Sequence, residues 1–96
     1  MFAMNNGEAF RASEDVVARE VGGEMVLLDL VSGTYFGLGA VGSRVWEQLS
    51  QGEASLAQLA NLIESEFEAP RKQIEQDLAE LLGQLAEKKL IASAAA

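Results

Sequence analysis

Apolar and polar residues alternate in three short runs in the first half of the chain. The runs span residues 16–21, 24–30 and 34–38, and glycines separate them. A period of two residues is typical of strands that have one buried face. The pattern therefore predicts three consecutive strands.

The first two runs are expected to form a hairpin. Gly22 and Gly23 lie between them, and two glycines suit a primed turn, which needs positive φ at both central positions. A two-residue turn pairs Val21 with Glu24.

The turn after the second run determines which side chains share a face. Gly33 suits the left-handed position of a three-residue loop, which pairs Leu30 with Thr34 and Leu28 with Phe36. This register predicts a core face made of Val17, Val26, Leu28, Phe36 and Leu38. The opposite, less apolar face then carries Ala18, Met25, Leu27, Tyr35 and Gly37.

After Gly39 the apolar residues recur every three or four positions, which is typical of helices. Helices are predicted over 40–50, 56–67 and 70–89, with Ser55 as the N-cap of the second and Pro70 in the first turn of the third. The inward-facing residues are expected to be Val41, Val45, Trp46, Leu49, Leu56, Leu59, Leu62, Ile63, Phe67, Ile74, Leu78, Leu81, Leu82 and Leu85.

Three antiparallel strands with one apolar face need helices to cover that face. The predicted fold class is α+β, with a three-stranded antiparallel sheet followed by three helices in one domain over residues 14–91. Residues 1–13 are polar and aperiodic and are expected to form a flexible arm. Residues 92–96, mostly alanine, are expected to form a frayed tail.

The charge of the chain narrows the range of its partners. Its 96 residues include 15 acidic and 7 basic ones, for a formal net charge of −8. Such a surface repels nucleic-acid phosphates and anionic membranes, so neither is expected as a partner. The N-terminus has no signal-peptide pattern, and no apolar run is long enough to span a bilayer, which predicts a cytoplasmic protein.

Few residues are suited to catalysis. The chain has no histidine and no cysteine, which removes thiolate nucleophiles, zinc–thiolate sites and the commonest general base. Residues 37–42 match the G-x-G-x-x-G pattern, but no parallel βαβ unit follows, so corner glycines are the better interpretation. The acids Glu75, Asp77 and Glu80 are interpreted as a solvated helix face. We expect no cofactor, no metal and no enzyme activity.

The run 34–38 ends the predicted sheet, so one of its sides lacks a neighbouring strand. Exposed N–H and C=O groups on an edge strand can pair with another chain, and no lysine, proline or inward charge blunts this edge. Gly37 places no side chain in the way of a docking backbone. A helix or the second copy in a homodimer could cover the edge, or the edge could bind a partner strand. The residues alone leave these alternatives open.

Residues 26–49, VLLDLVSGTYFGLGAVGSRVWEQL, are followed by two helical patterns and by LAEKKLI at 85–91. This arrangement resembles the PqqD-like proteins, the peptide-recognition domains of ribosomal peptide (RiPP) maturation pathways, also called RiPP recognition elements. The resemblance extends over residues 16–91. It implies a winged-helix-like fold and no catalysis.

The resemblance also implies a function and a partner. Such domains bind the leader segment of a precursor peptide as an extra strand and present it to a separate enzyme, such as a radical enzyme or a leader peptidase. The alternative is an acidic winged-helix domain that acts in protein interaction or regulation. Carried onto this chain, the implied peptide-binding residues are Thr34, Tyr35, Phe36, Gly37 and Leu38 on the strand, and Arg71, Lys72, Glu75, Leu78, Ala79 and Leu82 on the third helix.

Overall fold

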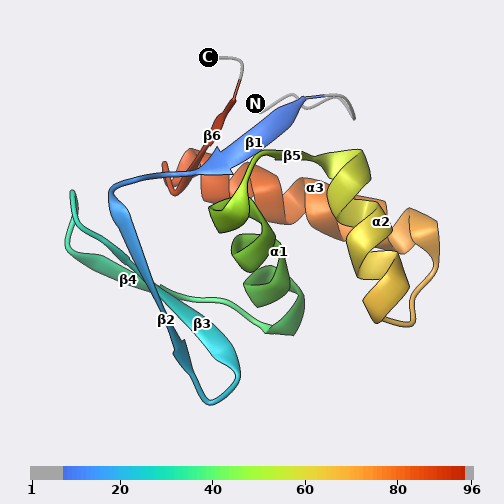
Figure 1. Ribbon diagram of the computed structural model, residues 1–96, viewed down its shortest axis with the longest axis horizontal. Coiled ribbons are helices and arrows are strands. Elements are labelled where there is room, and N and C mark those ends of the chain that lie inside the picture. The colour runs from blue at the N-terminus through green and yellow to red at the C-terminus, as the bar shows by residue number, and fades with distance from the viewer. Residues whose placement is uncertain (1–7, 95–96) are drawn as a thin grey trace.

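The computed structural model describes residues 8–94. In chain order the elements are β1 (Ala9–Ala12), β2 (Val16–Val21), β3 (Glu24–Asp29), β4 (Thr34–Gly37), α1 (Ala40–Gln51), β5 (Ala54–Ser55), α2 (Leu56–Glu66), α3 (Arg71–Glu87) and β6 (Ile91–Ser93). They form two antiparallel sheets, ordered β2-β3-β4 and β5-β1-β6, together with three helices (Figure 1). The predicted α+β class is confirmed, and so are the three consecutive antiparallel strands followed by three helices.

The β2–β3 hairpin has the predicted turn. Gly22 and Gly23 have φ of 61° and 87°, as a primed two-residue turn requires. Val21 pairs with Glu24, and the predicted register continues to the start of β2.

The β3–β4 turn is one residue longer than predicted. Asp29 pairs with Thr34, so the loop contains residues 30–33. The Asp29 carboxylate accepts hydrogen bonds from the Val31 N–H at 3.0 Å and from the Ser32 hydroxyl at 2.8 Å. Gly33 does take a left-handed conformation, with φ of 74°. The prediction of a three-residue loop is wrong, because Asp29 closes the wider turn through its side chain.

This extra loop residue reverses the predicted faces of β2 and β3, whereas the prediction that Phe36 and Leu38 face the core is confirmed. Leu27, not Leu28, lies opposite Phe36, and Leu27 is fully buried while Val17 is 52% exposed. Because side chains alternate along a strand, a shift of one residue exchanges the core face and the outer face. Met25 and Leu27 therefore belong to the core side, and the predicted core face of β2 and β3 is wrong.

Both chain ends contribute more to the fold than predicted. The expected arm includes β1, whose Phe10 is only 1% exposed. In the expected tail, Ala92 and Ser93 belong to β6 and pair with β1. The arm and the tail are strands because each supplies the other's backbone partners, a pairing between residues more than 80 positions apart. The arm prediction for residues 1–7 and the tail prediction for 95–96 lie outside the described residues.

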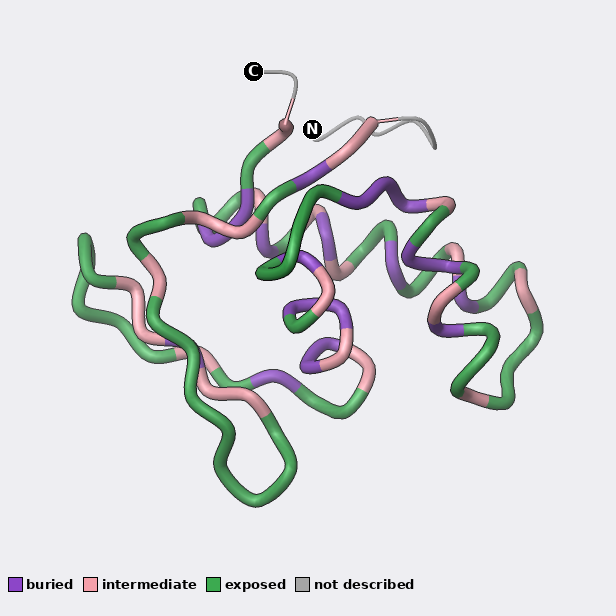
Figure 2. The backbone as a smooth tube through the Cα atoms, in the orientation of Figure 1, coloured by how far each residue is buried: buried purple, intermediate pink, exposed green. Residues whose placement is uncertain are grey.

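The helices begin and pack close to the predicted positions. Ser55 is the N-cap of α2 and forms a capping box with Gln58, with hydrogen bonds of 2.9 and 3.2 Å. Buried stretches recur along each helix, while the β2–β3 hairpin is mostly exposed (Figure 2). The buried core consists of Phe10, Leu27, Leu38, Val45, Trp46, Leu49, Ala54, Leu56, Leu59, Ala60, Ile63, Ile74, Leu78, Leu82, Leu85, Leu90 and Ile91.

Candidate functional site

Strand β4 is an edge of the sheet, and its register determines which backbone groups point outward. The Leu38 N–H donates to the Met25 carbonyl at 2.9 Å. Hydrogen-bonding direction alternates along an antiparallel strand. Phe36 and Thr34 therefore bond to β3 like Leu38, whereas the N–H and C=O groups of Tyr35 and Gly37 point away from the sheet.

These outward groups are free in the part of the chain that the structure describes. No other strand of residues 8–94 adjoins β4 on that side, because the sheet order is β2-β3-β4. The Tyr35 side chain is 68% exposed. A Cβ placed on Gly37 would meet no atom within 4 Å. The edge can therefore accept an additional strand without displacing any part of the described chain.

A crevice runs between β4 and the C-terminal half of α3. It has a volume of about 230 Å³ and an apolar floor, and its α3 side is formed by Leu81, Gln84, Leu85 and Lys88. A second hollow, of about 410 Å³, continues toward the β3–β4 turn and shares Phe36 and Lys88 with the first. Side chains of a strand added to β4 that point toward α3 would enter this crevice.

Lys88 lies at the boundary of the two hollows. Its ammonium nitrogen is 5.9 Å from the centre of the Phe36 ring, a distance at which the ring face attracts a cation. Lys88 is the charged residue that lines the smaller hollow. The crevice thus combines an apolar floor with one positive charge.

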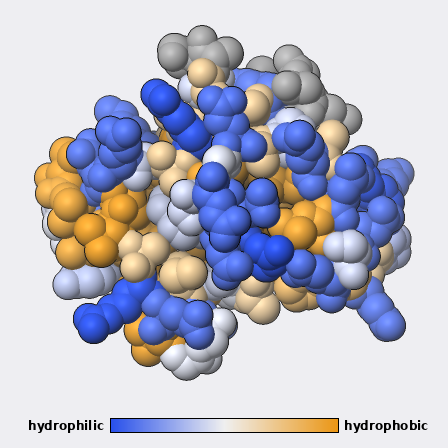
Figure 3. All heavy atoms as spheres, viewed as in Figure 1, coloured by the Kyte–Doolittle hydropathy of each residue, from blue (hydrophilic) through white to orange (hydrophobic). Residues whose placement is uncertain are grey.

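The surface next to the crevice is also apolar. Leu30 and Val31 in the β3–β4 turn are 58% and 78% exposed. Figure 3 shows an apolar area at its left, the side on which the β3–β4 turn lies in Figure 1. Exposed apolar groups beside a free strand edge favour a protein or peptide ligand over a small polar one.

Ser43 fixes the corner where β4 turns into α1. Its hydroxyl accepts a hydrogen bond from the Met25 N–H at 2.8 Å and donates one to the Leu38 carbonyl at 3.1 Å. Ser43 is 9% exposed, so both bonds are shielded from water. They hold the end of β4 and the start of β3 against α1, which keeps the free edge in place.

The predicted strand residues, Thr34 to Leu38, lie along this edge. The predicted helix residues do not meet it. Leu78 and Leu82 are buried in the core at 1% and 0% exposure. Ala79 is exposed, but it precedes Leu81 by two positions and therefore lies roughly 200° from it around the helix.

The other three predicted helix residues, Arg71, Lys72 and Glu75, lie at the opposite end of α3. The Arg71 guanidinium bonds to Glu75 at 2.9 Å, to Glu64 at 3.1 Å and to Asn61 at 2.7 Å. The hydrogen bond to Glu75 raises the pKa of Arg71 above its usual value, with further contributions from Glu64. Arg71 thus connects α3 to Asn61 and Glu64 of α2, Glu75 bonds to Arg71 within α3, and Lys72 is exposed.

The helical residues that do line the crevice were missed from the sequence. Of these residues, only Leu81 could have been identified from the sequence. It belongs to the apolar stripe of α3 but is only half-buried, so part of its side chain remains available to a ligand. Gln84 and Lys88 look like ordinary surface residues until α3 is placed beside β4.

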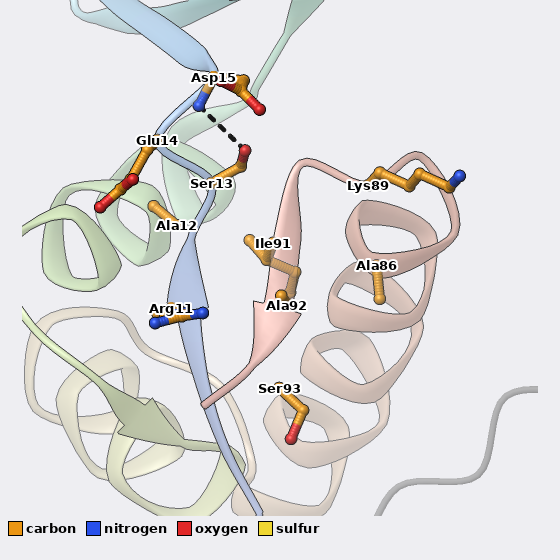
Figure 4. A pocket seen from close by; sticks show the side chains of 10 residues that line it. All are labelled: Arg11, Ala12, Ser13, Glu14, Asp15, Ala86, Lys89, Ile91, Ala92 and Ser93. Carbon is orange, nitrogen blue, oxygen red and sulfur yellow. Dashed lines mark hydrogen bonds between the residues drawn. The ribbon is translucent and has the colours of Figure 1, made fainter. Parts of the chain in front are cut away.

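A further hollow, of about 710 Å³, lies between β1, β6 and the end of α3 (Figure 4). Its charged side chains, Arg11, Glu14, Asp15 and Lys89, spread apart around apolar residues. The Ser13 hydroxyl accepts a hydrogen bond from the Asp15 N–H at 3.1 Å. Because these charges have both signs and do not converge on one point, the hollow indicates no particular class of ligand.

Residues 8–94 contain no group of three or more acidic side chains that could hold a metal ion. Within the same range, no helix has the length and apolar content required of a membrane span. The free edge of β4 and its crevice therefore remain the best-defined site of this part of the chain.

Two solved structures of leader-peptide complexes are similar to this chain. TbiB1 in complex with the TbiA(beta) leader peptide is 41% identical, with a TM-score of 0.78 over 84% of this chain and 93% of that chain. A lasso peptide synthetase B1 complexed with its leader peptide is 31% identical, with a TM-score of 0.75 over 86% and 96% of the two chains.

The PqqD truncation of Methylobacterium extorquens PqqCD, described as a stand-alone RiPP recognition element, shares the fold. Its TM-score is 0.76 at 24% identity, over 94% of this chain and 95% of that chain. No curated protein matches this chain. The family model described as Coenzyme PQQ synthesis protein D (PqqD) matches residues 24–91, which is most of the sequence. The chain belongs to the PqqD family.

Proposed function

We propose that this protein captures the leader segment of a ribosomally synthesised precursor peptide by strand addition to β4. It then presents the bound peptide to a separate modifying enzyme. The domain itself contributes binding and orientation, and the chemistry belongs to the partner, a radical enzyme or a leader peptidase.

One observation carries this proposal: the outward N–H and C=O groups of Tyr35 and Gly37 lie beside an apolar crevice. Backbone pairing supplies affinity that depends little on sequence, and pockets for alternate side chains supply specificity. Both requirements are met along one strand. TbiB1 and the lasso peptide synthetase B1, which have been solved with leader peptides bound, support the choice of ligand.

The register suggests how the leader is read. A leader residue opposite Phe36 points its side chain to the same side as the Phe36 ring, toward α3. That side chain enters the crevice lined by Leu81, Gln84 and Lys88. We assign the side-chain selection to these three residues, while Thr34 to Leu38 form the backbone platform. Leu78 and Leu82 pack in the core and hold α3 in position.

Titration with the TbiA(beta) leader peptide tests the proposal. In the isotope-labelled full chain, amide shifts are expected at Tyr35, Gly37, Leu81 and Gln84. Gly37→Pro removes one outward N–H and leaves the pairing between β3 and β4 intact, because that N–H does not face β3. The loss of one backbone hydrogen bond and the restriction of φ weaken binding by about tenfold or more.

Gly37→Ala is the matched control. It keeps the N–H, and the added Cβ meets no atom within 4 Å, so its affinity should stay near that of the parent. Circular dichroism checks that both variants are folded. Strand addition at β4 is wrong if Gly37→Pro binds the leader as tightly as Gly37→Ala, or if the shifts lie outside β4 and α3.

A further inference from the structure

The sheet has a second free edge, on β2. The Leu30 N–H donates to the Asp15 carbonyl at 2.9 Å, which fixes the phase of pairing between β2 and β3. By the same alternation, the N–H and C=O groups of Val16, Ala18 and Glu20 point away from β3. None of these groups has a hydrogen-bond partner within residues 8–94.

The helices do not cover the inner side of this edge. Ala18 pairs with Leu27 and therefore shares its face, yet Leu27 is fully buried and Ala18 is exposed. A hollow of about 500 Å³ separates β2 from α1. It is comparable in size to typical ligand sites. It is lined by Ala12, Ser13, Glu14, Val16, Ala18, Glu20, Met25, Trp46, Glu47, Leu49 and Ser50.

The lining of this hollow has a definite chemistry. Val16, Met25 and Leu49 are among the apolar residues that line it, while three carboxylates, Glu14, Glu20 and Glu47, carry its charge. No lysine or arginine lines it. Of the three acids, Glu47 forms an ion pair with Arg44 at 3.3 Å. Glu14 and Glu20 form no ion pair in the described chain.

The two free edges of the sheet therefore differ in charge. The crevice beside β4 is lined by Lys88 and by no acid, and the hollow that continues it toward the β3–β4 turn carries both lysines and acids. The hollow beside β2, in contrast, is lined by acids and by no base. A basic segment is therefore favoured at the β2 edge, where no lysine or arginine of the lining opposes it.

We propose that the β2 edge, together with α1, is a second strand-docking site, and that its ligand is an extended, basic segment of a partner protein. The backbone of that segment pairs with Val16, Ala18 and Glu20. Its apolar side chains fill the floor of the hollow, and its lysines or arginines meet Glu14 and Glu20. This site goes beyond leader capture at β4 and does not depend on it.

The arrangement gives the domain a way to hold two chains at once. Strands in a sheet are spaced by about 4.8 Å, so strands added to β2 and to β4 lie roughly 20 Å apart. A partner docked at β2 is thereby kept close to a peptide docked at β4. Such tethering raises the effective concentration of the bound partner near the bound peptide, although the two make no direct contact.

A pair of synthetic peptides tests the site. The probe is a heptapeptide of alternating threonine and valine with lysine at both ends, and the matched peptide has glutamate at both ends. The lysine peptide is expected to shift the amides of Val16, Ala18 and Glu20 and to change the fluorescence of Trp46, the only tryptophan. The glutamate peptide should bind at least about tenfold more weakly.

Two proline variants separate the edges. Ala18→Pro removes an N–H that faces away from β3, so the hairpin should survive and binding of the lysine peptide should fall by about tenfold. Gly37→Pro, at the other edge, should leave that binding unchanged. The charge-reversal variant Glu20→Lys, at an exposed position, should also weaken binding of the lysine peptide. It keeps the test valid if Ala18→Pro fails to fold.

Several results would overturn the proposal. They are no binding of the lysine peptide, equal binding of both peptides, or shifts confined to β4 and α3. Dimerisation of the free chain that Ala18→Pro abolishes would make a second copy, and not a basic partner, the occupant of this edge. Because leader binding is measured separately at β4, failure of either site leaves the other assignment intact.

Discussion

Leu27 in β3 pairs directly with Phe36 in β4, and both side chains point toward the helices. The neighbouring pair, Leu28 and Tyr35, points to the opposite, outer face. This register sets both the core side of the sheet and the backbone groups that β4 leaves free.

Truncation of the two adjacent leucines should have unequal effects. Leu27→Ala leaves a cavity beneath the sheet and is expected to lower the free energy of unfolding by about 2–5 kcal/mol. Leu28→Ala removes a half-buried side chain from the outer face, so the cost should be about 1 kcal/mol. Urea unfolding of both variants measures the difference. Equal losses would contradict the assignment of faces.

Ser43→Ala should destabilise the corner between β4 and α1. The substitution removes the partners of the Met25 N–H and the Leu38 carbonyl, and the expected cost is about 1–3 kcal/mol. Ser50→Ala is the control, because the Ser50 hydroxyl donates to the Glu47 carbonyl at an exposed position. Thermal unfolding should separate the variants. A Ser43→Ala protein as stable as Ser50→Ala would show that the buried hydroxyl is dispensable.

Phe10→Ala tests the role of the N-terminal strand. Phe10 is 1% exposed and belongs to the main core, so its truncation is expected to cost about 3–5 kcal/mol. Arg11→Ala, at an exposed neighbour in the same strand, should change stability by less than about 0.5 kcal/mol. A small effect of Phe10→Ala, measured by chemical unfolding, would mean that β1 contributes little to the domain.

Lys89→Gly should stabilise the protein. Lys89 has φ of 62° and follows the end of α3, where the Leu90 N–H bonds to the Leu85 carbonyl and the Lys89 N–H to that of Ala86. This is a Schellman motif, in which glycine avoids the cost of a left-handed side-chain-bearing residue.

The expected gain for Lys89→Gly is up to about 1 kcal/mol, because the larger entropy of glycine in the unfolded chain offsets part of the relief. Lys88→Gly is the control, since Lys88 has φ of −85° and no such strain to relieve. Melting temperatures compare the two. If Lys89→Gly lowers the melting temperature, the contacts of the lysine side chain outweigh the strain.

Local features of the sequence were sufficient to predict the helices, the three strands of the main sheet and the register of one of its two hairpins. Gly22 and Gly23 determine the β2–β3 register, because a two-residue primed turn leaves one way to pair the strands. Ser55 and Gln58 likewise mark the start of α2 through a capping box that can be read from their spacing. Strand order alone also placed residues 34–38 at an edge of the sheet, whereas the residues left open whether a helix or a second copy covers that edge.

The missed features depend on contacts between distant residues or on a single loop position. The Asp29 side chain widens one turn by one residue, and the period of two along a strand converts that difference into a reversed core face. Phe10 lies in a mostly polar stretch of the sequence and becomes buried only when β1 pairs with β6, at the other end of the chain.

The sequence by itself determined the class of fold, the turn glycines and the position of residues 34–38 at the end of the sheet, because these depend on neighbours within a few positions and on strand order. Only the tertiary structure decided which half of α3 faces β4, and hence that Leu81, Gln84 and Lys88 line the crevice while Arg71 binds α2. A helical stripe specifies which side of a helix is buried. It does not specify which end of that helix lies beside a given strand, because that depends on how all the elements pack together.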